Sequence, residues 1–221
     1  MSITEKRQEK FDRVVANRQH DLAILLENVH DKHNIGAVLR SCDSVGIADV
    51  YVLFTMEGLD QKYFKVGQQA SSGALKWVRT HFYRDREACF KEVRKKYKHI
   101  LGTHLDSKAK SLYDLDLSES TLLVFGNEHQ GITDETLKHL DGNFIIPQMG
   151  MVQSLNISVA CAVTLYEVAR QRIKAGKYKE VSEERKAYQE ELSDYYSKIN
   201  KTRERAIFNK RLRPDFLGDL Q

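Results

Sequence analysis

Four polar or glycine-bearing stretches of this sequence each follow a short apolar run. They are NVHDKHN (28–34), TH (103–104), GNEHQGIT (126–133) and QMGMVQSLN (148–156). In parallel α/β sheets, ligands bind outside the carboxyl ends of the strands, and that is where such stretches meet. Their amide, hydroxyl, carboxylate and imidazole groups could bind and orient a substrate. The sequence therefore predicts one ligand site at one edge of a sheet.

Several common kinds of site are missing from the sequence. It has no G-x-x-x-x-G-K-[ST] phosphate loop and no G-x-G-x-x-G dinucleotide loop. It also lacks a G-x-S-x-G elbow, so Ser154 is not expected to be a hydrolase nucleophile. His30 and His33 flank Asp31, but no second cluster of metal ligands accompanies them. We therefore expect no metal site and no nicotinamide-type oxidoreductase.

The elements that must position these stretches alternate along the chain. Continuous apolar runs predict buried strands at 22–27, 49–54, 99–105, 121–126 and 143–147. Helical spacing or composition predicts helices at 4–18, 34–46, 86–98, 134–140 and 154–174. Asn34 is expected to cap the second helix, and Gly46 and Gly176 are expected to end helices. The alternation predicts an α/β fold with a mostly parallel sheet and helices on both faces.

Positive charge is concentrated at the two ends of the 221-residue chain. The net charge is +4 overall, but residues 1–20 carry +2, residues 170–221 carry +5 and residues 21–169 carry −3. Basic arms around a slightly acidic centre favour an anionic polymer as the partner. The sequence has no run of 18 apolar residues and its first residues are charged, so we expect no membrane span, no signal peptide and a cytoplasmic location.

Three motifs together resemble a known family. HNIGAVLRSCDSVG (33–46), LLVFGNEHQGI (122–132) and IIPQMGMVQSLNISVACA (145–162) are similar, in order and spacing, to the signature motifs of the SpoU/TrmH branch of the SPOUT RNA 2′-O-ribose methyltransferases. The resemblance implies a deep trefoil knot in the C-terminal part of the fold, which periodicity cannot predict because knots are very rare. It also implies an S-adenosylmethionine cofactor and a homodimer with the active site near the subunit interface.

The flanking segments resemble the subgroup of this family that methylates guanosine 18 of tRNA. We therefore expect an N-terminal helical extension at 1–20, a methyltransferase domain at 21–175 and a basic C-terminal helical arm at 176–221. The sequence departs from the usual pattern at Lys32, Ser41 and His129, where the family often has proline, threonine and glycine. His129 lies in the second motif, so substrate preference within the family stays open at this point.

The resemblance implies roles for particular residues. The predicted catalytic residues are Arg40, Asn34, Glu128, Ser154 and Asn156. The predicted cofactor pocket consists of Thr103, Gly126, Ile146, Met149, Gly150, Met151, Ser154 and Leu155. The guanidinium of Arg40 could grip the phosphate beside the target ribose. The family assigns this arginine as the general base, whereas a guanidinium hardly loses its proton in proteins, so both roles are kept open.

RNA contacts are expected from basic residues of the two arms. These are Arg7, Arg13, Arg18, Lys174, Lys201, Arg203, Arg205, Lys210, Arg211 and Arg213. Two other functions remain as alternatives. A family relative could act on ribosomal RNA or on another tRNA position, and the fold could serve as a non-catalytic RNA-binding module. The set of polar residues in the three motifs argues against the second alternative, because a binding module has no need for it.

Overall fold

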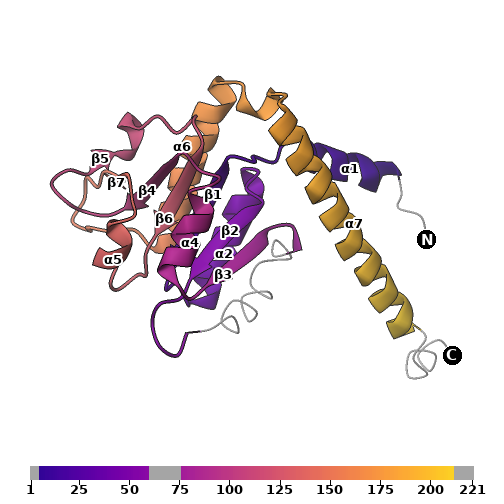
Figure 1. Cartoon of the computed structure of the whole chain (residues 1–221), viewed down its shortest axis with the longest axis horizontal. Helices are drawn as coiled ribbons and strands as arrows, with labels where there is room; N and C mark the ends of the chain where they lie inside the picture. Colours follow the sequence, from indigo (N-terminus) through magenta and orange to yellow (C-terminus); the bar gives the residue numbers. More distant parts are fainter. Residues whose placement is uncertain (1–4, 60–75, 212–221) are drawn as a thin grey trace. The chain divides into compact units, whose positions relative to one another are not determined.

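The computed structural model describes residues 5–59 and 76–211, with side chains as far as residue 199. The chain divides into two compact units, one of residues 17–180 and one formed by Met1–Ala16 with Val181–Gln221. The first unit contains the predicted α/β sheet and the second is helical (Figure 1). Within the described residues, no helix is long and apolar enough to cross a membrane.

The α/β unit is built on a seven-stranded sheet with the order β3-β2-β1-β6-β4-β7-β5. Every neighbouring pair of these strands runs parallel, as predicted. The strands are β1 (Leu22–Glu27), β2 (Asp49–Leu53), β3 (Arg79–Tyr83), β4 (His99–Thr103), β5 (Lys110–Ser111), β6 (Thr121–Phe125) and β7 (Gly142–Ile145). Neither β3 nor β5 was predicted, because β3 is half-buried throughout and β5 has two residues, so neither forms a continuous apolar run.

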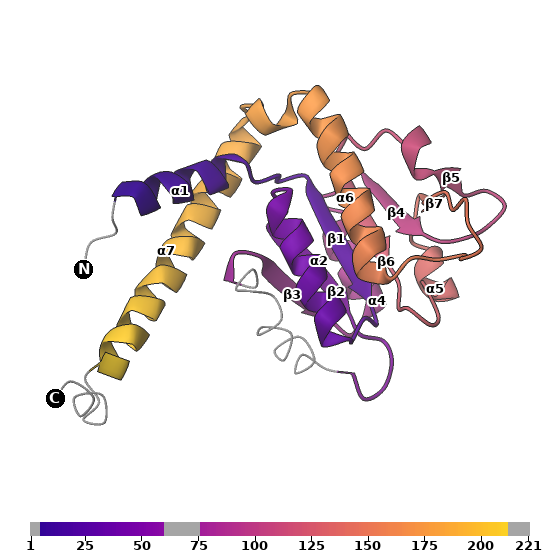
Figure 2. The ribbon, with the colours of Figure 1, turned by 180° about the vertical axis from the view of Figure 1, so that it is seen from behind.

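Helices cover both faces of the sheet. The helices α2 (Lys32–Ser44) and α6 (Ile157–Lys174) lie together on one face, which Figure 2 shows in front. On the other face lie α4 (Arg86–Val93) and the short α5 (Asp134–Leu137), visible in Figure 1. Successive β1 side chains enter opposite cores: Ile24 packs on the α2/α6 side and Leu25 on the α4 side. All six residues of β1 are buried, which confirms the prediction of a strand covered on both faces.

Two predicted helix starts need correction. The side chain of Asp31, not Asn34, caps α2, because its Oδ1 accepts the backbone N–H groups of His33 and Asn34 at 2.9 and 2.8 Å. The helix α6 begins at Ile157 rather than near residue 154, and Asn156 is its N-cap. Gly46 and Gly176 follow the ends of α2 and α6 with φ values of +84° and +75°, which confirms both as helix stops.

The second unit pairs α1 (Glu5–Ala16) with α7 (Glu183–Arg211). The guanidinium of Arg185 donates a 2.7 Å hydrogen bond to the carbonyl of Ala16, which is the last residue of α1. Leu192 and Tyr196 of α7 are buried. The two helices therefore pack against each other, although no residue of α1 is fully buried. A 3₁₀ turn at Lys177–Lys179 follows α6 within the first unit.

Candidate functional site

A cavity of about 760 Å³ lies at the carboxyl ends of β4, β6 and β7. Its walls come from the segment that follows each of these strands, together with the first turn of α6. Three of the four polar stretches that we singled out in the sequence therefore line one cavity, as expected for a parallel sheet. Its wall includes the apolar side chains of Ile146 and Leu155. It also includes Gly126 and Gly150, where the backbone itself faces the cavity. Such a wall suits a ligand with flat apolar parts and a few polar edges.

A chain of hydrogen bonds connects the three sequence motifs beside this cavity. Asn34, in the first turn of α2, donates through Nδ2 to Glu128 Oε1 at 2.6 Å. Asn156 donates through Nδ2 to Asn34 Oδ1 at 3.1 Å. Asn34 therefore donates one hydrogen bond and accepts another, and it links the loop 126–133 to the start of α6. Glu128 and Asn156 also line the cavity, so the structure brings three predicted catalytic residues together.

The orientation of Asn156 is fixed from its other side. Its Oδ1 accepts the backbone N–H of Ser158 at 2.9 Å and the hydroxyl of Ser158 at 2.6 Å. These bonds leave Nδ2 as the group that faces Asn34. A residue that could have been an ordinary helix cap is therefore both a cap and a member of the network.

Predicted cofactor residues fall into two groups. The cavity is lined by Thr103, Gly126, Ile146, Gly150, Ser154 and Leu155. Met149 and Met151 are not among its lining residues, and these two residues are 95% and 99% exposed. The structure thus separates the two methionines from the remainder of the predicted pocket. Ser154 is exposed on the wall, and no hydrogen bond of its side chain occurs within the described residues.

Arg40 lies away from the network that its neighbour Asn34 joins. The two residues are six positions apart on α2, which is about 9 Å along the helix axis. The Arg40 side chain is exposed, does not line the cavity and makes no ion pair in the part of the chain that the structure describes. The guanidinium is therefore available to an external anion rather than committed to a structural carboxylate.

Sequence reasoning missed the residues that hold the loops in place. Asn28 follows β1 with a φ of +55°, an unusual backbone conformation that asparagine tolerates better than most residues. Its Oδ1 accepts the N–H groups of Thr55 and Met56 at 2.9 and 3.2 Å. Its carbonyl accepts the side-chain amide of Asn127 at 3.1 Å. An asparagine directly after a buried strand was the available signal, because asparagine is enriched in this conformation.

The predicted RNA-binding arginines differ in exposure. Arg18 is fully buried and bonds to Asp43 Oδ1 at 2.6 Å and to the carbonyls of Ile47 and Trp77. It therefore has no surface to offer RNA, and its prediction as a contact is corrected to a structural role. Arg13 and Lys174 are exposed, and Arg7 lies 5.7 Å from the ring centre of Phe11. The predicted positions in the C-terminal arm lie outside the described side chains, and these are Lys201, Arg203, Arg205, Lys210, Arg211 and Arg213.

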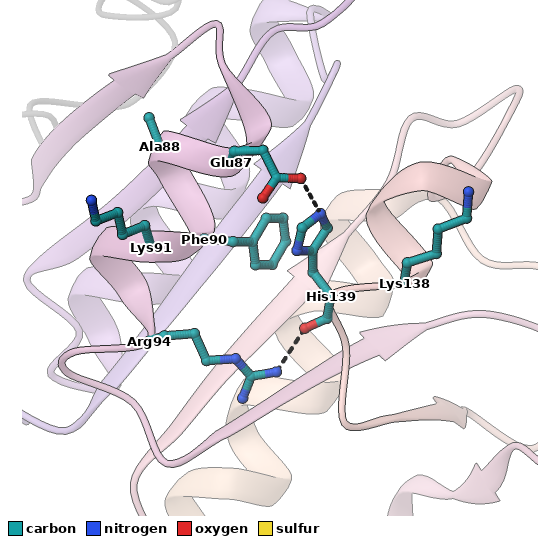
Figure 3. Close-up of a pocket in the computed structure, with 7 residues that line it drawn as sticks. All are labelled: Glu87, Ala88, Phe90, Lys91, Arg94, Lys138 and His139. Atoms are coloured by element: carbon teal, nitrogen blue, oxygen red, sulfur yellow. Dashed lines mark hydrogen bonds and ion pairs between the residues drawn. The ribbon is translucent and has the colours of Figure 1, made fainter.

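A second hollow, of about 580 Å³, lies on the α4 face between α4 and the segment after α5 (Figure 3). The rings of His139 and Phe90 stack there with centres 4.5 Å apart, and His139 Nε2 lies 3.2 Å from Glu87 Oε1. Arg94 donates to the carbonyl of His139 at 2.7 Å and pairs with Asp141. These polar groups are occupied by contacts between α4 and the segment after α5, so this hollow is a packing seam rather than the candidate site.

The comparisons with known proteins agree with this geometry. The model of the SpoU rRNA methylase family matches residues 21–166. The chain is 37% identical over 195 residues to the tRNA (guanosine(18)-2′-O)-methyltransferase of Thermus thermophilus, covering 88% of this chain and 98% of that protein. A crystal structure of the TrmH/SpoU tRNA modifying enzyme of A. aeolicus superposes with a TM-score of 0.75 at 31% identity, covering 88% and 96%. AviRb of Streptomyces viridochromogenes, crystallised with AdoMet, superposes with a TM-score of 0.62 at 27% identity, covering 71% and 59%.

Proposed function

Because this chain belongs to the SpoU rRNA methylase family, we propose that it transfers a methyl group from S-adenosylmethionine to a ribose 2′-hydroxyl of tRNA. The proposed nucleotide is guanosine 18 of the D-loop. The similarity to the Thermus enzyme covers 98% of that protein and extends beyond residues 21–166. Two proteins that shared only a catalytic domain would be similar within that domain alone. Part of the sequence outside residues 21–166 therefore belongs to the similarity, which favours tRNA over ribosomal RNA.

The observation that carries the proposal is the Glu128–Asn34–Asn156 chain beside the cavity. A non-catalytic RNA-binding module would need exposed cations, but it would have no use for a carboxylate and two amides connected across three loops. A ribose hydroxyl is a weak nucleophile that must be held in line with the methyl donor. Polar side chains with fixed donor and acceptor directions can hold it.

The cavity fits S-adenosylmethionine in size and in the character of its walls. Its volume of about 760 Å³ is in the range of ligand pockets. We assign the adenosine to the part lined by Ile146 and Leu155, whose side chains would cover its faces, with Thr103, Gly126 and Gly150 at its polar edge. When bound, the cofactor supplies a methyl group already activated by the sulfonium charge. Met149 and Met151 are not assigned to this pocket in the single chain.

Arg40 is proposed to bind the phosphate next to the target ribose. An exposed guanidinium offers a planar fork of donors that matches two phosphate oxygens. Guanidinium groups hardly lose their proton in proteins, so the proposed contribution of Arg40 is to hold the nucleotide and to stabilise charge, and the adjacent phosphate oxygens are the acceptor left for the hydroxyl proton. Ser154 and Asn156 are proposed to meet the nucleotide where the cavity opens.

We further propose that the active protein is a cytoplasmic homodimer with the trefoil knot of its family. Val159, Tyr166 and Ile173 are exposed at 46%, 60% and 67%, and their spacing of seven residues forms an apolar stripe along α6. An exposed apolar stripe of this kind supports an interface. The proposal of a knot rests on the family to which the chain belongs.

Mapping the modified ribose tests the proposed function. The purified protein is incubated with S-adenosylmethionine carrying a labelled methyl group and with total tRNA, and the labelled position is mapped. The expected result is label on the ribose of guanosine 18. Label on another tRNA position, or only on added ribosomal RNA, would replace the substrate. Label on a base would contradict the reaction, and tight RNA binding without label would indicate the binding module.

A further inference from the structure

A fully buried carboxylate, Glu27, ends the central strand β1. Its Oε1 accepts the hydroxyls of Thr133 and Thr136 at 2.7 and 2.6 Å, and its Oε2 accepts the backbone N–H of Thr133 at 3.0 Å. Arg86, the first residue of α4, places its Nη2 3.6 Å from Oε1. All of these partners lie in α4, in α5 or in the loop that precedes α5, so one side chain of β1 ties that loop to the sheet.

Stability alone does not explain why a carboxylate is buried at this position. Taking a carboxylate out of water costs several kcal/mol, and a well-packed apolar side chain at such a position is often as stable or more stable. A carboxylate surrounded by three directed donors instead specifies where those donors lie. The most direct consequence of Glu27 is therefore a fixed position for Thr133.

Thr133 ends the loop 126–133, which carries Glu128. The loop closes on itself through paired backbone bonds between Asn127 and Gly131 of 3.1 and 2.8 Å. Its first part is held by the bond from Asn127 to the carbonyl of Asn28. Its last part is held by Glu27. Asn28, which follows β1, and Glu27, the last residue of β1, thus bind the two ends of the loop. Glu128 lies between these two points of attachment.

Other contacts hold α5 independently of Glu27. Arg86 Nε donates to the Thr136 hydroxyl at 2.8 Å. Beyond the helix, the ring of His139 stacks on Phe90, and Arg94 binds the His139 carbonyl (Figure 3). Arg86 Nη2 also donates to the Thr133 hydroxyl, at 3.3 Å. Loss of the carboxylate removes the two shorter bonds to Thr133 and should therefore loosen this end of the loop, while α5 stays against α4.

We infer that Glu27 is a positioning residue for methyl transfer, which acts by fixing loop 126–133 so that Glu128 meets Asn34. This inference rests on the proposed function. Glu27 is buried, so it does not touch RNA or cofactor itself. Its effect reaches the site through the loop, whose residues Gly126, Asn127, Glu128 and Gly131 line the cavity.

The test variant is Glu27→Gln, which keeps the shape but replaces one acceptor oxygen with an NH₂ group that faces donors. The single-turnover rate with saturating cofactor and tRNA should fall by about 10- to 100-fold, as expected when a reacting geometry is loosened. The affinity for tRNA should stay within about twofold, because the charge of the RNA-binding surface is unchanged. The backbone amides of residues 127–133 should exchange hydrogen faster, which can be measured without any ligand.

Two further variants separate positioning from stability. Asp49→Asn removes another buried carboxylate, which binds Arg79 and His81 at 2.6 Å where β2 begins, and should reduce stability without a comparable loss of rate in the folded protein. Thr136→Val removes one donor to Glu27 and should give a smaller loss of rate than Glu27→Gln. It is the test variant if Glu27→Gln fails to fold, and a parent-like rate and exchange pattern would then overturn the inference. Combining Glu27→Gln with Glu128→Gln should cost little more than Glu128→Gln alone.

The outcomes separate this inference from the proposed function. If the parent protein transfers no methyl group to RNA, the proposed function is wrong, and the exchange experiment still reports whether Glu27 holds the loop. If the parent is active but Glu27→Gln keeps its rate and its exchange pattern, the inference is wrong. Additive losses in the double variant would also overturn it, because Glu27 would then act by a route other than Glu128.

Discussion

Asn34 Nδ2 lies 2.6 Å from Glu128 Oε1, although 94 positions separate the two residues in the sequence. The same Asn34 accepts a bond from Asn156, 122 positions away. The side chain of Asn34 therefore connects the segments that carry Glu128 and Asn156. A change at Asn34 should lower the rate of methyl transfer more than it lowers the stability of the fold.

Asn34→Ala removes both bonds and should lower the single-turnover rate of methyl transfer by about 10-fold, equivalent to about 1.4 kcal/mol, because these bonds are partly exposed to water. Asn34→Asp should be worse, since it places a second carboxylate against Glu128. Cofactor affinity should change little in the alanine variant. Equal rates in the parent and both variants would show that the network is structural.

Arg40→Lys tests whether the shape of the guanidinium matters as well as its charge. The lysine keeps the charge but loses the planar fork, so the single-turnover rate should fall at least about 100-fold. The melting temperature should be unchanged, because Arg40 is exposed and makes no ion pair within the described residues. A near-parent rate with saturating cofactor would remove Arg40 from the reaction.

How much of the site could be predicted depends on whether a residue belongs to one of the three motifs or holds a motif in place from outside it. Asn34, Glu128 and Asn156 were predicted from motifs and were found in one network. Glu27 and Asn28 were not, because a glutamate that ends an apolar run looks like an ordinary strand boundary until its partners near Thr133 are known. The parallel sheet could be predicted from continuous apolar runs, since a strand covered on both faces needs them.

The wrong predictions have physical causes of the same kind. Arg18 was grouped with basic surface residues by charge, yet its guanidinium lies among carbonyl groups with Asp43. Charge alone cannot distinguish a buried arginine that holds several backbone carbonyls from an exposed one. Asn34 was expected to cap α2, but Asp31 is also a good cap, and only the backbone geometry decides between them.

The ion pair between buried Arg172 and partly buried Asp21 predicts how stability depends on pH. Burial alone would raise the pKa of Asp21, but the 2.7 Å bond to Arg172 and its charge outweigh burial and hold the pKa below the ordinary value. Asp21 therefore adds stability above its unfolded-state pKa of about 3.9, and this stability is lost as the pH falls through the lower folded-state pKa.

Asp21→Asn should accordingly reduce the free energy of unfolding in urea at pH 7, and the difference from the parent should shrink as the pH is lowered below about 4. The variant also leaves the buried Arg172 without its carboxylate, although its bonds to carbonyl groups remain, so the loss at pH 7 should be about 1.5–3 kcal/mol, as for a hydrogen bond to a charged group. A difference that stays constant between pH 7 and 3 would mean that the charge of Asp21 is not what stabilises the fold.

The exposed stripe on α6 predicts the oligomeric state. Tyr166→Glu places a charge in the middle of the proposed interface and should raise the dimer dissociation constant at least about 100-fold, measured by sedimentation equilibrium. Tyr113→Glu is the matched control, because Tyr113 is similarly exposed, at 57%, but lies in the 3₁₀ turn after β5. If both variants remain dimers, or if the parent is a monomer, the stripe has another partner.

Basic residues of the C-terminal arm should determine the salt dependence of tRNA binding. Each phosphate contact adds about 0.7–0.9 to the slope of log affinity against log salt concentration. Replacing three cations with glutamine should therefore weaken binding and lower that slope by about 2. The three are Lys210, Arg211 and Arg213. Cofactor affinity should not change, because no residue of α7 lines the cavity among the described residues.

The control variant replaces Lys95, Lys96 and Lys98, which are exposed just before β4 begins. They lie at the amino end of this strand, whereas the cavity lies at its carboxyl end, so their replacement should leave the slope unchanged. Equal losses in both triples would mean that overall charge, rather than the arm, attracts the RNA.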